Sequence, residues 1–324
     1  MNFFGYKRPD GRVGVRNKVL ILPASVCASD TTRIISQQVV GSVTFNNQLG
    51  CSQVASDQQF TMDVMAGYAA NPNVYGTVVV SLGCENCQMD LVVEAIRQRT
   101  NKPLKQVIIQ EAGGTLKAID MAVRYAKEMV EEASLLQKEE FPMSELIIGT
   151  ECGGSDPTSG LAANPLIGQL SDLIVKEGGT SILSETTEFI GAEHILARRA
   201  ATPEVHDRIF EIVHRYEKAL QLVGEEVREG NPSPGNKAGG LTCLERSPWA
   251  ASTRAATAPS TLCMTTPSRW RPSRAWSSWT PRATIPPLWR AWWPAVPRSW
   301  CSPRAAARPP AIPWLPLSKS RATS

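Results

Sequence analysis

The chain has 324 residues and a formal net charge of +4, a length that allows about two domains. No charged-then-apolar leader opens it and no apolar run approaches the roughly 18 residues of a membrane span, so we expect a cytoplasmic protein without a membrane partner. The charge is uneven, because residues 242–324 hold 12 basic side chains against one acidic one, whereas residues 1–241 hold 22 against 29. The basic balance therefore belongs to the end of the chain alone.

Short apolar runs, most of them rich in β-branched residues, recur through the first 190 residues. Runs of this kind are typical of strands that are covered on both faces of a sheet. The predicted strands are residues 17–24, 41–45, 76–83, 104–111, 144–151 and 180–185.

Between these runs lie segments with helical periodicity, clearest over residues 113–136 and 207–227. Alternating strands and helices predict parallel sheets with right-handed crossovers. We therefore predict an α/β protein with two Rossmann-like parallel-sheet units, over residues 1–140 and 141–245, followed by an irregular tail.

Cysteines gather where the predicted strands end. Cys51 follows the second strand, Cys84, Glu85 and Cys87 follow the third, and Cys152 follows the fifth. Ligands of open parallel sheets bind beyond the carboxyl ends of the strands, and thiolates with carboxylates suit a transition metal. The alternative is that these cysteines are small buried apolar residues of a protein in a reducing compartment.

Two other strand-end loops carry glycine pairs, "AGGT" at 112–115 and "GGSD" at 153–156. Such a pair before a helix lets backbone amides approach an anion, or simply permits a tight turn. Neither loop matches a nucleotide-binding fingerprint. Glu185 and Glu188 follow the sixth strand, where they would serve as acid and base or place negative charge in the first turn of a helix.

Several long motifs resemble the catalytic region of the altronate/galactarate dehydratase family. In chain order they are "GYKRPDGRVGVRN", "LGCSQ", "NPNVYGTVVVSLGCENCQ", "ECGGSDPTSGLAANPLIG", "GGTSILSETTEFIGAE" and "NPSPGNKAGGLT". The resemblance implies a metal-dependent hydro-lyase that converts a small hydroxy acid, in this family a sugar acid, to a 2-keto-3-deoxy acid. It also implies a divalent metal, most often Fe(II), with Mn or another metal as alternatives.

The resemblance and the strand-end rule together give the expected site. The expected acid/base residues are Asp156, Glu185 and Glu188. The expected metal ligands are Cys51, Cys84, Glu85 and Cys152. The expected substrate-binding residues are Arg12, Arg16, Asn17, Gly153, Gly154, Ser155, Asn164 and Asn236.

A second branch of the same family is the large subunit of (2R)-sulfolactate sulfo-lyase, which eliminates sulfite from a three-carbon hydroxy acid. Asn47 and Asn71 stand where the sugar-acid dehydratases commonly carry histidine, which favours this branch. The chain also starts directly at the catalytic region, as two-subunit members do. The resemblance then implies a separate small SAF-domain subunit, and we also expect a homo-oligomer and no nucleic-acid partner.

The tail from residue 246 has a different composition. All nine tryptophans and 14 of the 24 prolines lie there, whereas every glycine lies before residue 241. A hypothetical coding string for "SPWAASTRAATAP" (247–259) reads "SLGCIHKGGHSP", a family-like sequence, when displaced by one base. We therefore expect residues 246–324 to be an out-of-frame, disordered translation that leaves apolar surface of the second unit uncovered. The alternatives are an arm that binds nucleic acid or membrane, and an inactive family member.

Overall fold

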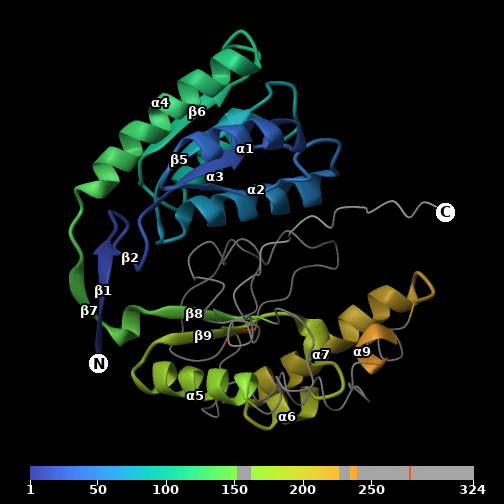
Figure 1. Cartoon of the computed structure of the whole chain (residues 1–324). Coiled ribbons are helices and arrows are strands. Elements are labelled where there is room, and N and C mark those ends of the chain that lie inside the picture. The colour runs from blue at the N-terminus through green and yellow to red at the C-terminus, as the bar shows by residue number, and fades with distance from the viewer. Residues whose placement is uncertain (152–161, 226–233, 239–276, 279–324) are drawn as a thin grey trace, which may run out of the picture.

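The computed structural model describes residues 1–151, 162–225, 234–238 and 277–278. The expected tail, residues 246–324, lies outside the described residues except for Ser277–Ser278. Within the described part the chain is an α/β protein with two parallel sheets (Figure 1).

The first unit is built on a four-stranded parallel sheet with the order β4-β3-β5-β6. Its strands are β3 (Lys18–Pro23), β4 (Ser42–Thr44), β5 (Val74–Ser81) and β6 (Leu104–Ile108). These are the first four strands predicted from the sequence. Their near-continuous apolar runs are explained by cover on both faces of the sheet.

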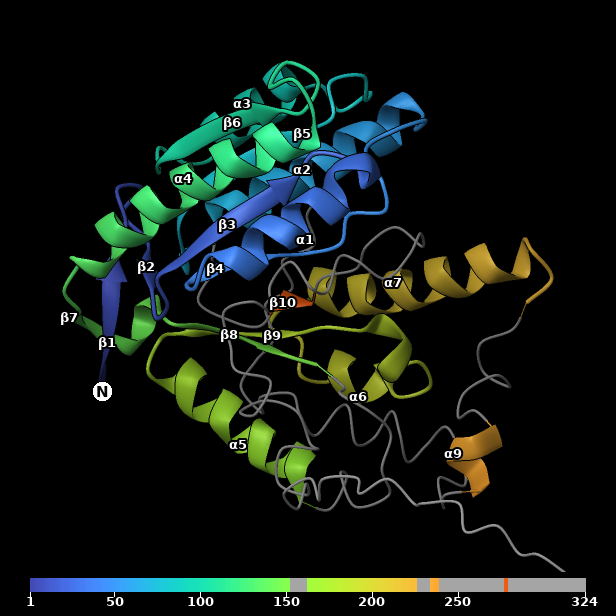
Figure 2. The same ribbon diagram turned by 45° about the horizontal axis from the view of Figure 1, so that its top comes forward.

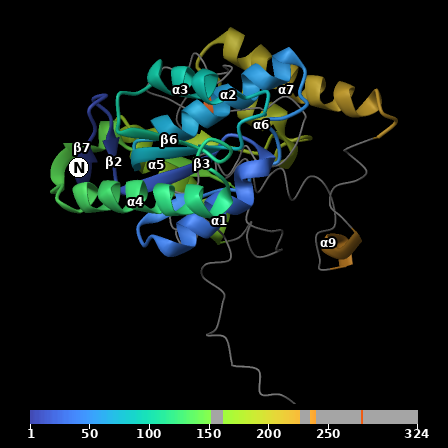
Figure 3. The ribbon, with the colours of Figure 1, turned by 90° about the horizontal axis from the view of Figure 1, so that it is seen from above.

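Helices α1 (Ser29–Gln38) and α4 (Thr115–Ser134) cover one face, and α2 (Ala55–Ala70) and α3 (Met89–Arg97) cover the other (Figure 3). Because side chains alternate along a strand, Val19 and Ile21 of β3 enter the core beneath α1 and α4. Leu20 and Leu22 enter the core beneath α2 and α3. All four are at most 2% exposed, and burying each contributes about 1.5–3 kcal/mol.

The second unit contains β8 (Ile147–Thr150) and β9 (Thr180–Leu183) in parallel, with the two-residue β10 (Ser277–Ser278) beside β9. Its helices are α5 (Ala163–Lys176), α6 (Glu193–Ala197), α7 (Pro203–Gln221) and α9 (Pro234–Ala238). Helix α7 begins where Thr202 caps its first turn and Pro203 supplies the preset backbone angle. On α5, Leu166, Leu170 and Leu173 form an exposed stripe at helical spacing.

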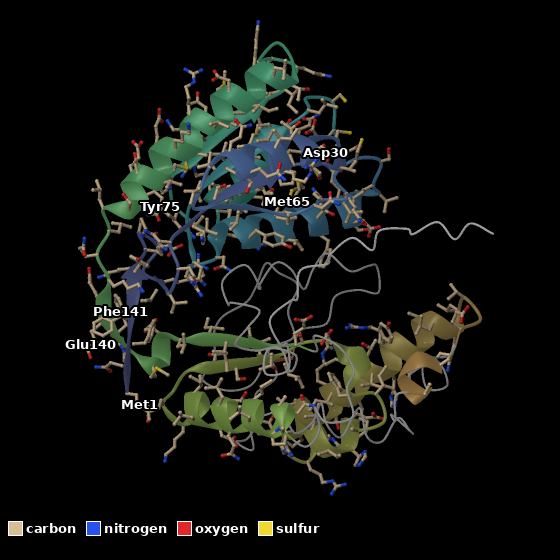
Figure 4. The ribbon with its side chains drawn as sticks, viewed as in Figure 1. Met1, Asp30, Met65, Tyr75, Glu140 and Phe141 are labelled. Carbon is tan, nitrogen blue, oxygen red and sulfur yellow. The ribbon has the colours of Figure 1, made fainter. Side chains whose placement is uncertain are left out.

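A small antiparallel sheet joins the two units and was not predicted. Strand β1 (Asn2–Lys7) pairs with both β2 (Val13–Gly14) and β7 (Glu139–Pro142). Figure 4 shows the beginning of β1, where Met1 lies near Glu140 and Phe141 of β7. There the amino group of Met1 lies 2.5 Å from a carboxylate oxygen of Glu177, at the end of α5. The first strand therefore begins at the second unit and ends at the first.

The strands of both parallel sheets run away from this connecting sheet, so that their carboxyl ends open toward the same side of the molecule (Figures 1 and 2). The short 3-10 turns η1 (Val26–Ala28), η2 (Met143–Glu145) and η3 (Thr186–Glu188) complete the described elements. No helix among the described residues has both the length and the apolar character that crossing a membrane requires.

Candidate functional site

Three loops meet at the carboxyl end of the first sheet, and we call them the first rim: residues 24–28, 45–54 and 82–88. The Cys87 amide donates to the Gly50 carbonyl at 3.0 Å, and the Val26 amide donates to the Leu49 carbonyl at 2.8 Å. The Ser52 amide donates to the Asn86 side chain at 2.8 Å. The first rim therefore brings together cysteines from three separate segments, namely Cys27, Cys51, Cys84 and Cys87.

Two glycines of the first rim have positive φ angles, and one of them lies where two of the loops approach each other closely. Gly50 has φ +97°, and a Cβ there would lie 2.3 Å from the Ala24 carbonyl oxygen. Gly83 has φ +121°, and a Cβ there would lie 2.7 Å from the Gln110 side chain. The glycines of "LGC" in both motifs are thus explained by backbone geometry.

Glu85 occupies the interior of the first rim and is only 3% exposed. Its carboxylate accepts hydrogen bonds from the amides of Leu82, at 2.9 Å, and Gly83, at 2.6 Å. Burial by itself would raise the pKa of Glu85, but hydrogen bonds from the backbone and from Ser81 outweigh it, and the pKa is lowered. The carboxylate is therefore ionised and already satisfied by the protein.

The four cysteines differ in exposure. Cys87 is fully buried, and burial, followed by the neighbouring charges of Glu85 and Cys51, raises the pKa of its thiol to about 11. Cys27 and Cys84 are exposed, and Cys51 is partly buried. With a pKa this far above neutral, the Cys87 side chain is a thiol and not a thiolate at pH 7.

The expected metal ligands do not form a metal site within the described part of the chain. There, no group of three or more His, Cys, Asp or Glu side chains is placed to hold a metal ion. Cys51, Cys84 and Glu85 do share the first rim, but the Glu85 oxygens are taken by backbone amides. The fourth expected ligand, Cys152, lies outside the described residues.

The expected substrate clamp, Arg12, Arg16 and Asn17, lies at the opposite end of the sheet from the first rim, because Asn17 directly precedes β3. Arg12 pairs with Asp10 at 2.7 Å, and Asn17 accepts from Arg8 at 2.8 Å. The exposed Arg16 makes a backbone hydrogen bond to the Asn73 side chain. These contacts hold the segment between β1 and β3 in place, and the three residues do not lie at the first rim.

A buried charged cluster at that same end was missed by the sequence analysis. Lys102 is 2% exposed and donates to the carbonyls of Asn71, at 2.6 Å, and Val74, at 3.0 Å. Burial lowers the pKa of Lys102 to about 7, although the nearby Asp10 acts in the other direction. Lysine is rarely fully buried, and no pattern in the sequence marked this one.

Asn47 and Asn71, the two positions that favoured the sulfo-lyase branch, lie at opposite ends of the first sheet. Asn47 is 5% exposed at the first rim, where its side chain donates to the Pro23 carbonyl at 3.0 Å and accepts from the Leu49 amide at 3.0 Å. The Asn71 side chain accepts from the Asn73 amide at 2.9 Å in the turn before β5. Only Asn47 is near the first rim.

The carboxyl end of the second sheet has its own loops, and we call residues 162–164 and 184–190 the second rim. Asn164, an expected substrate-binding residue, lies there at 5% exposure. Glu185 follows β9 in the left-handed region, with φ +66°, a conformation that costs a non-glycine residue about 1–3 kcal/mol. Glu188 belongs to η3, but its side chain is outside the described part.

The side chains of the other expected residues fall outside the described part of the chain. Cys152, Gly153, Gly154, Ser155 and Asp156 lie in 152–161, outside the described residues. Asn236 lies in α9, and its side chain is likewise outside the described part. The structure thus brings Glu185 and Asn164 to one rim and Cys51, Cys84 and Glu85 to the other.

Two family models match the chain in order. Residues 5–134 match the D-galactarate dehydratase/altronate hydrolase second domain. Residues 143–270 match the C-terminal domain of D-galactarate/altronate dehydratase. The boundary between the two matches falls at β7, which enters the connecting sheet.

Characterised relatives cover about three quarters of the chain. Altronate dehydratase of Bacillus subtilis strain 168 is 38% identical over 253 residues, which is 75% of this chain and 50% of the relative. The (2R)-sulfolactate sulfo-lyase subunit beta of Chromohalobacter salexigens is 35% identical over 75% of this chain and 62% of the relative. Galactarate dehydratase (L-threo-forming) of Escherichia coli strain K12 is 32% identical over 74% of this chain and 49% of the relative. The chain thus spans about half the length of the dehydratases that it matches.

Proposed function

Because the chain belongs to the D-galactarate/altronate dehydratase family of hydro-lyases, we propose that it removes water from a sugar acid to give a 2-keto-3-deoxy acid. The observation that carries this proposal is the similarity to altronate dehydratase over 75% of the chain. Two domain matches in order, covering both α/β units, support it.

The reaction breaks the C–H bond beside the carboxylate and the C–O bond of the adjacent hydroxyl group. The electron pair of the C–H bond forms a double bond, the hydroxyl leaves as water with one proton, and the resulting enol tautomerises to the 2-keto acid. The protein's part is to remove the first proton and to protonate the leaving oxygen. It also has to stabilise the negative charge that develops on the carboxylate side.

Among the described residues, Glu185 is the base that we propose for this reaction. Its position in the second rim, directly after β9, is the place where ligands of parallel sheets bind. Its left-handed backbone is a strain of the kind that clusters at functional sites. Asp156 and Glu188 remain predicted partners from the sequence.

The proposed function is tested by incubating the full chain with altronate, galactarate and sulfolactate. Release of a 2-keto acid from either sugar acid, lost in Glu185→Gln, would support it. The matched control is Glu111→Gln, at an exposed position in the first unit. Glu193→Gln is unsuitable as a control because the Glu193 carboxylate accepts a hydrogen bond from the Gly191 amide. The reaction should be run after chelation and again with added Fe(II) or Mn, because the metal requirement stays a prediction.

A second candidate is elimination of sulfite from sulfolactate. The chain covers a larger share of the sulfo-lyase subunit, 62%, than of the dehydratases, and the subunit's name implies a second kind of chain in that enzyme. For this protein we accordingly propose a small partner subunit as the alternative arrangement. Sulfite release from sulfolactate, without keto-acid formation from the sugar acids, would favour this candidate.

A further inference from the structure

Two buried polar atoms have no hydrogen-bond partner. They are Oδ1 of Asn164 and Oγ1 of Thr186, and they are the only such side-chain atoms found among the described residues. Asn164 is 5% exposed and Thr186 is 7% exposed. A buried polar atom left unpaired costs about 1–3 kcal/mol, so each of these atoms calls for an explanation.

Both residues belong to the second rim. Asn164 is the second residue of α5, the helix that follows β8, and Thr186 opens η3 three residues after β9 ends. Because β8 and β9 are parallel neighbours, both unpaired atoms lie at the same end of the sheet. The Cα–Cβ bonds of a helix tilt toward its N-terminus, so the Asn164 side chain leans out of α5 toward this rim.

The start of α5 adds two backbone amides, those of Ala163 and Asn164; Pro165 has none, and the Leu166 amide donates to the Ala162 carbonyl at 3.2 Å. The helix is 14 residues long, has no side-chain cap at Ala162 and has no acidic residue in its first turn. The first amides of a helix lack internal partners, and together with the helix dipole they attract an anion. The second rim thus offers amide donors for an anionic group beside two buried oxygens that require further partners.

These groups define the chemistry of a ligand. An amide oxygen such as Oδ1 only accepts hydrogen bonds, whereas a hydroxyl such as that of Thr186 donates and accepts. An inorganic phosphate dianion brings few or no donors to an amide oxygen. A carboxylate that carries hydroxyl groups offers an anionic group to the amides of α5 and hydroxyl groups to both Asn164 Oδ1 and Thr186 Oγ1.

We propose that the second rim binds a polyhydroxylated carboxylate, with its carboxylate at the first amides of α5 and its hydroxyl groups on Asn164 Oδ1 and Thr186 Oγ1. The inference rests on the proposed function for the identity of the ligand and assigns two side chains to its recognition. Asn164 and Thr186 bind and orient, and the adjacent Glu185 is left for proton transfer.

The test uses two isosteric variants of the full chain, Asn164→Leu and Thr186→Val, and two readouts that move in opposite directions. Without ligand, each variant should unfold at a higher temperature, because an unpaired buried polar atom has been removed. With altronate as the probe, each should bind about tenfold more weakly, the equivalent of one lost hydrogen bond. Binding is measured by calorimetry, with propionate as a carboxylate that has no hydroxyl groups and inorganic phosphate as a second anion.

The matched control is Ser181→Ala, a buried hydroxyl of β9 that does have a partner, the Ser171 hydroxyl at 2.9 Å. This variant should unfold at a lower temperature and bind altronate unchanged. Propionate and phosphate should bind weakly and equally to all forms.

The outcomes separate this inference from the proposed function. If altronate turns over and both variants keep the original affinity, the inference is wrong and the dehydratase assignment stands. If altronate binds with the predicted loss in both variants but is never converted, the inference stands and the assignment fails. Failure of altronate and galactarate to bind the unmodified chain, or lower unfolding temperatures for both variants, would also overturn the inference.

Discussion

At the scale of single residues, the first rim is organised around an ionised carboxylate whose charge is stabilised by hydrogen bonds from the protein. Glu85 accepts the amides of Leu82 and Gly83 and lies 3.4 Å from the Ser25 hydroxyl. Hydrogen bonds to a charged group are stronger than neutral ones, so the carboxylate holds the loop after β5 in shape. From the sequence, the same residue between two cysteines suggested a metal ligand.

Replacing Glu85 with glutamine should therefore destabilise the first unit. The new amide group offers a donor to backbone amides that are themselves donors, and we expect a loss of about 2 kcal/mol in the free energy of unfolding. Denaturant unfolding followed by circular dichroism measures this loss. Glu111→Gln, an exposed position after β6, should leave the free energy unchanged, and an equally small effect in Glu85→Gln would contradict the structural role.

The cysteines of the first rim should react in the order of their exposure. Cys84 and Cys27 are exposed, whereas Cys87 is fully buried beneath the loops. We expect iodoacetamide at pH 8 to label Cys84 and Cys27 within minutes and Cys87 only after denaturation, as read by peptide mass spectrometry. Rapid labelling of Cys87 in the folded protein would show that the 82–88 loop opens. The labelled Cys87 peptide is identified by its absence in the Cys87→Ser variant.

At the scale of secondary structure, periodicity predicted the elements that bury their own side chains. All six predicted strands exist, and the two predicted helices correspond to α4 and α7. The short strands β1, β2 and β7 were not predicted, because "EEFP" carries charge and proline and owes its strand conformation to pairing with β1. A pairing between residues that lie 134 to 140 positions apart in the sequence leaves no local signal.

The candidate site was predictable only where a residue's place follows from the end of a strand. Cys51, Cys84 and Glu185 were found at rims for that reason. Arg12 and Asn17 lie at the other end of the first sheet, and a charged motif near the chain start does not by itself indicate which end of the sheet it reaches. Thr186 carried no signal at all, since its importance comes from a missing partner.

Lys102, just before β6, donates hydrogen bonds to the Asn71 and Val74 carbonyls at the start of β5. This buried lysine should make the free energy of unfolding depend on pH. Its pKa is about 7 in the folded chain and about 10.4 in an unfolded one. Between these values the unfolded chain binds the extra proton, so the free energy of unfolding rises with pH. From pH 7 to pH 9 the rise from this residue should be roughly 2 kcal/mol.

The comparison that isolates Lys102 is Lys102→Met against the exposed Lys127→Met on α4. Denaturant unfolding at pH 7, 8 and 9 should show the added slope in the original chain and in Lys127→Met, and its absence in Lys102→Met. Parallel curves for all three proteins would mean that Lys102 keeps an ordinary pKa.

At the scale of the whole molecule, the two units differ in how complete their described cores are. The first unit has helices on both faces of a four-stranded sheet and two separate buried clusters. The second has one buried cluster, and its helix α5 carries the exposed leucine stripe. Apolar side chains gathered on a helix face usually meet another surface, and the first unit has no such stripe on a comparable helix among its described elements.

Removing the residues after Gly240 should therefore leave the first unit intact. The tail contains 14 prolines and no glycine, and proline at this density interrupts helices and strands, so we expect trypsin to remove residues after Arg246 under conditions that spare β3 to β6. A chain ending at Gly240 should show the same unfolding transition for the first unit as the full chain, because both of its buried clusters lie within residues 19–130. A tail that resists trypsin, or a first unit that loses its transition on truncation, would show that residues 246–324 contribute native packing.

Sequencing the coding DNA gives the independent check, since a single-base shift that restores a family-like reading after residue 246 is expected only if the tail is out of frame.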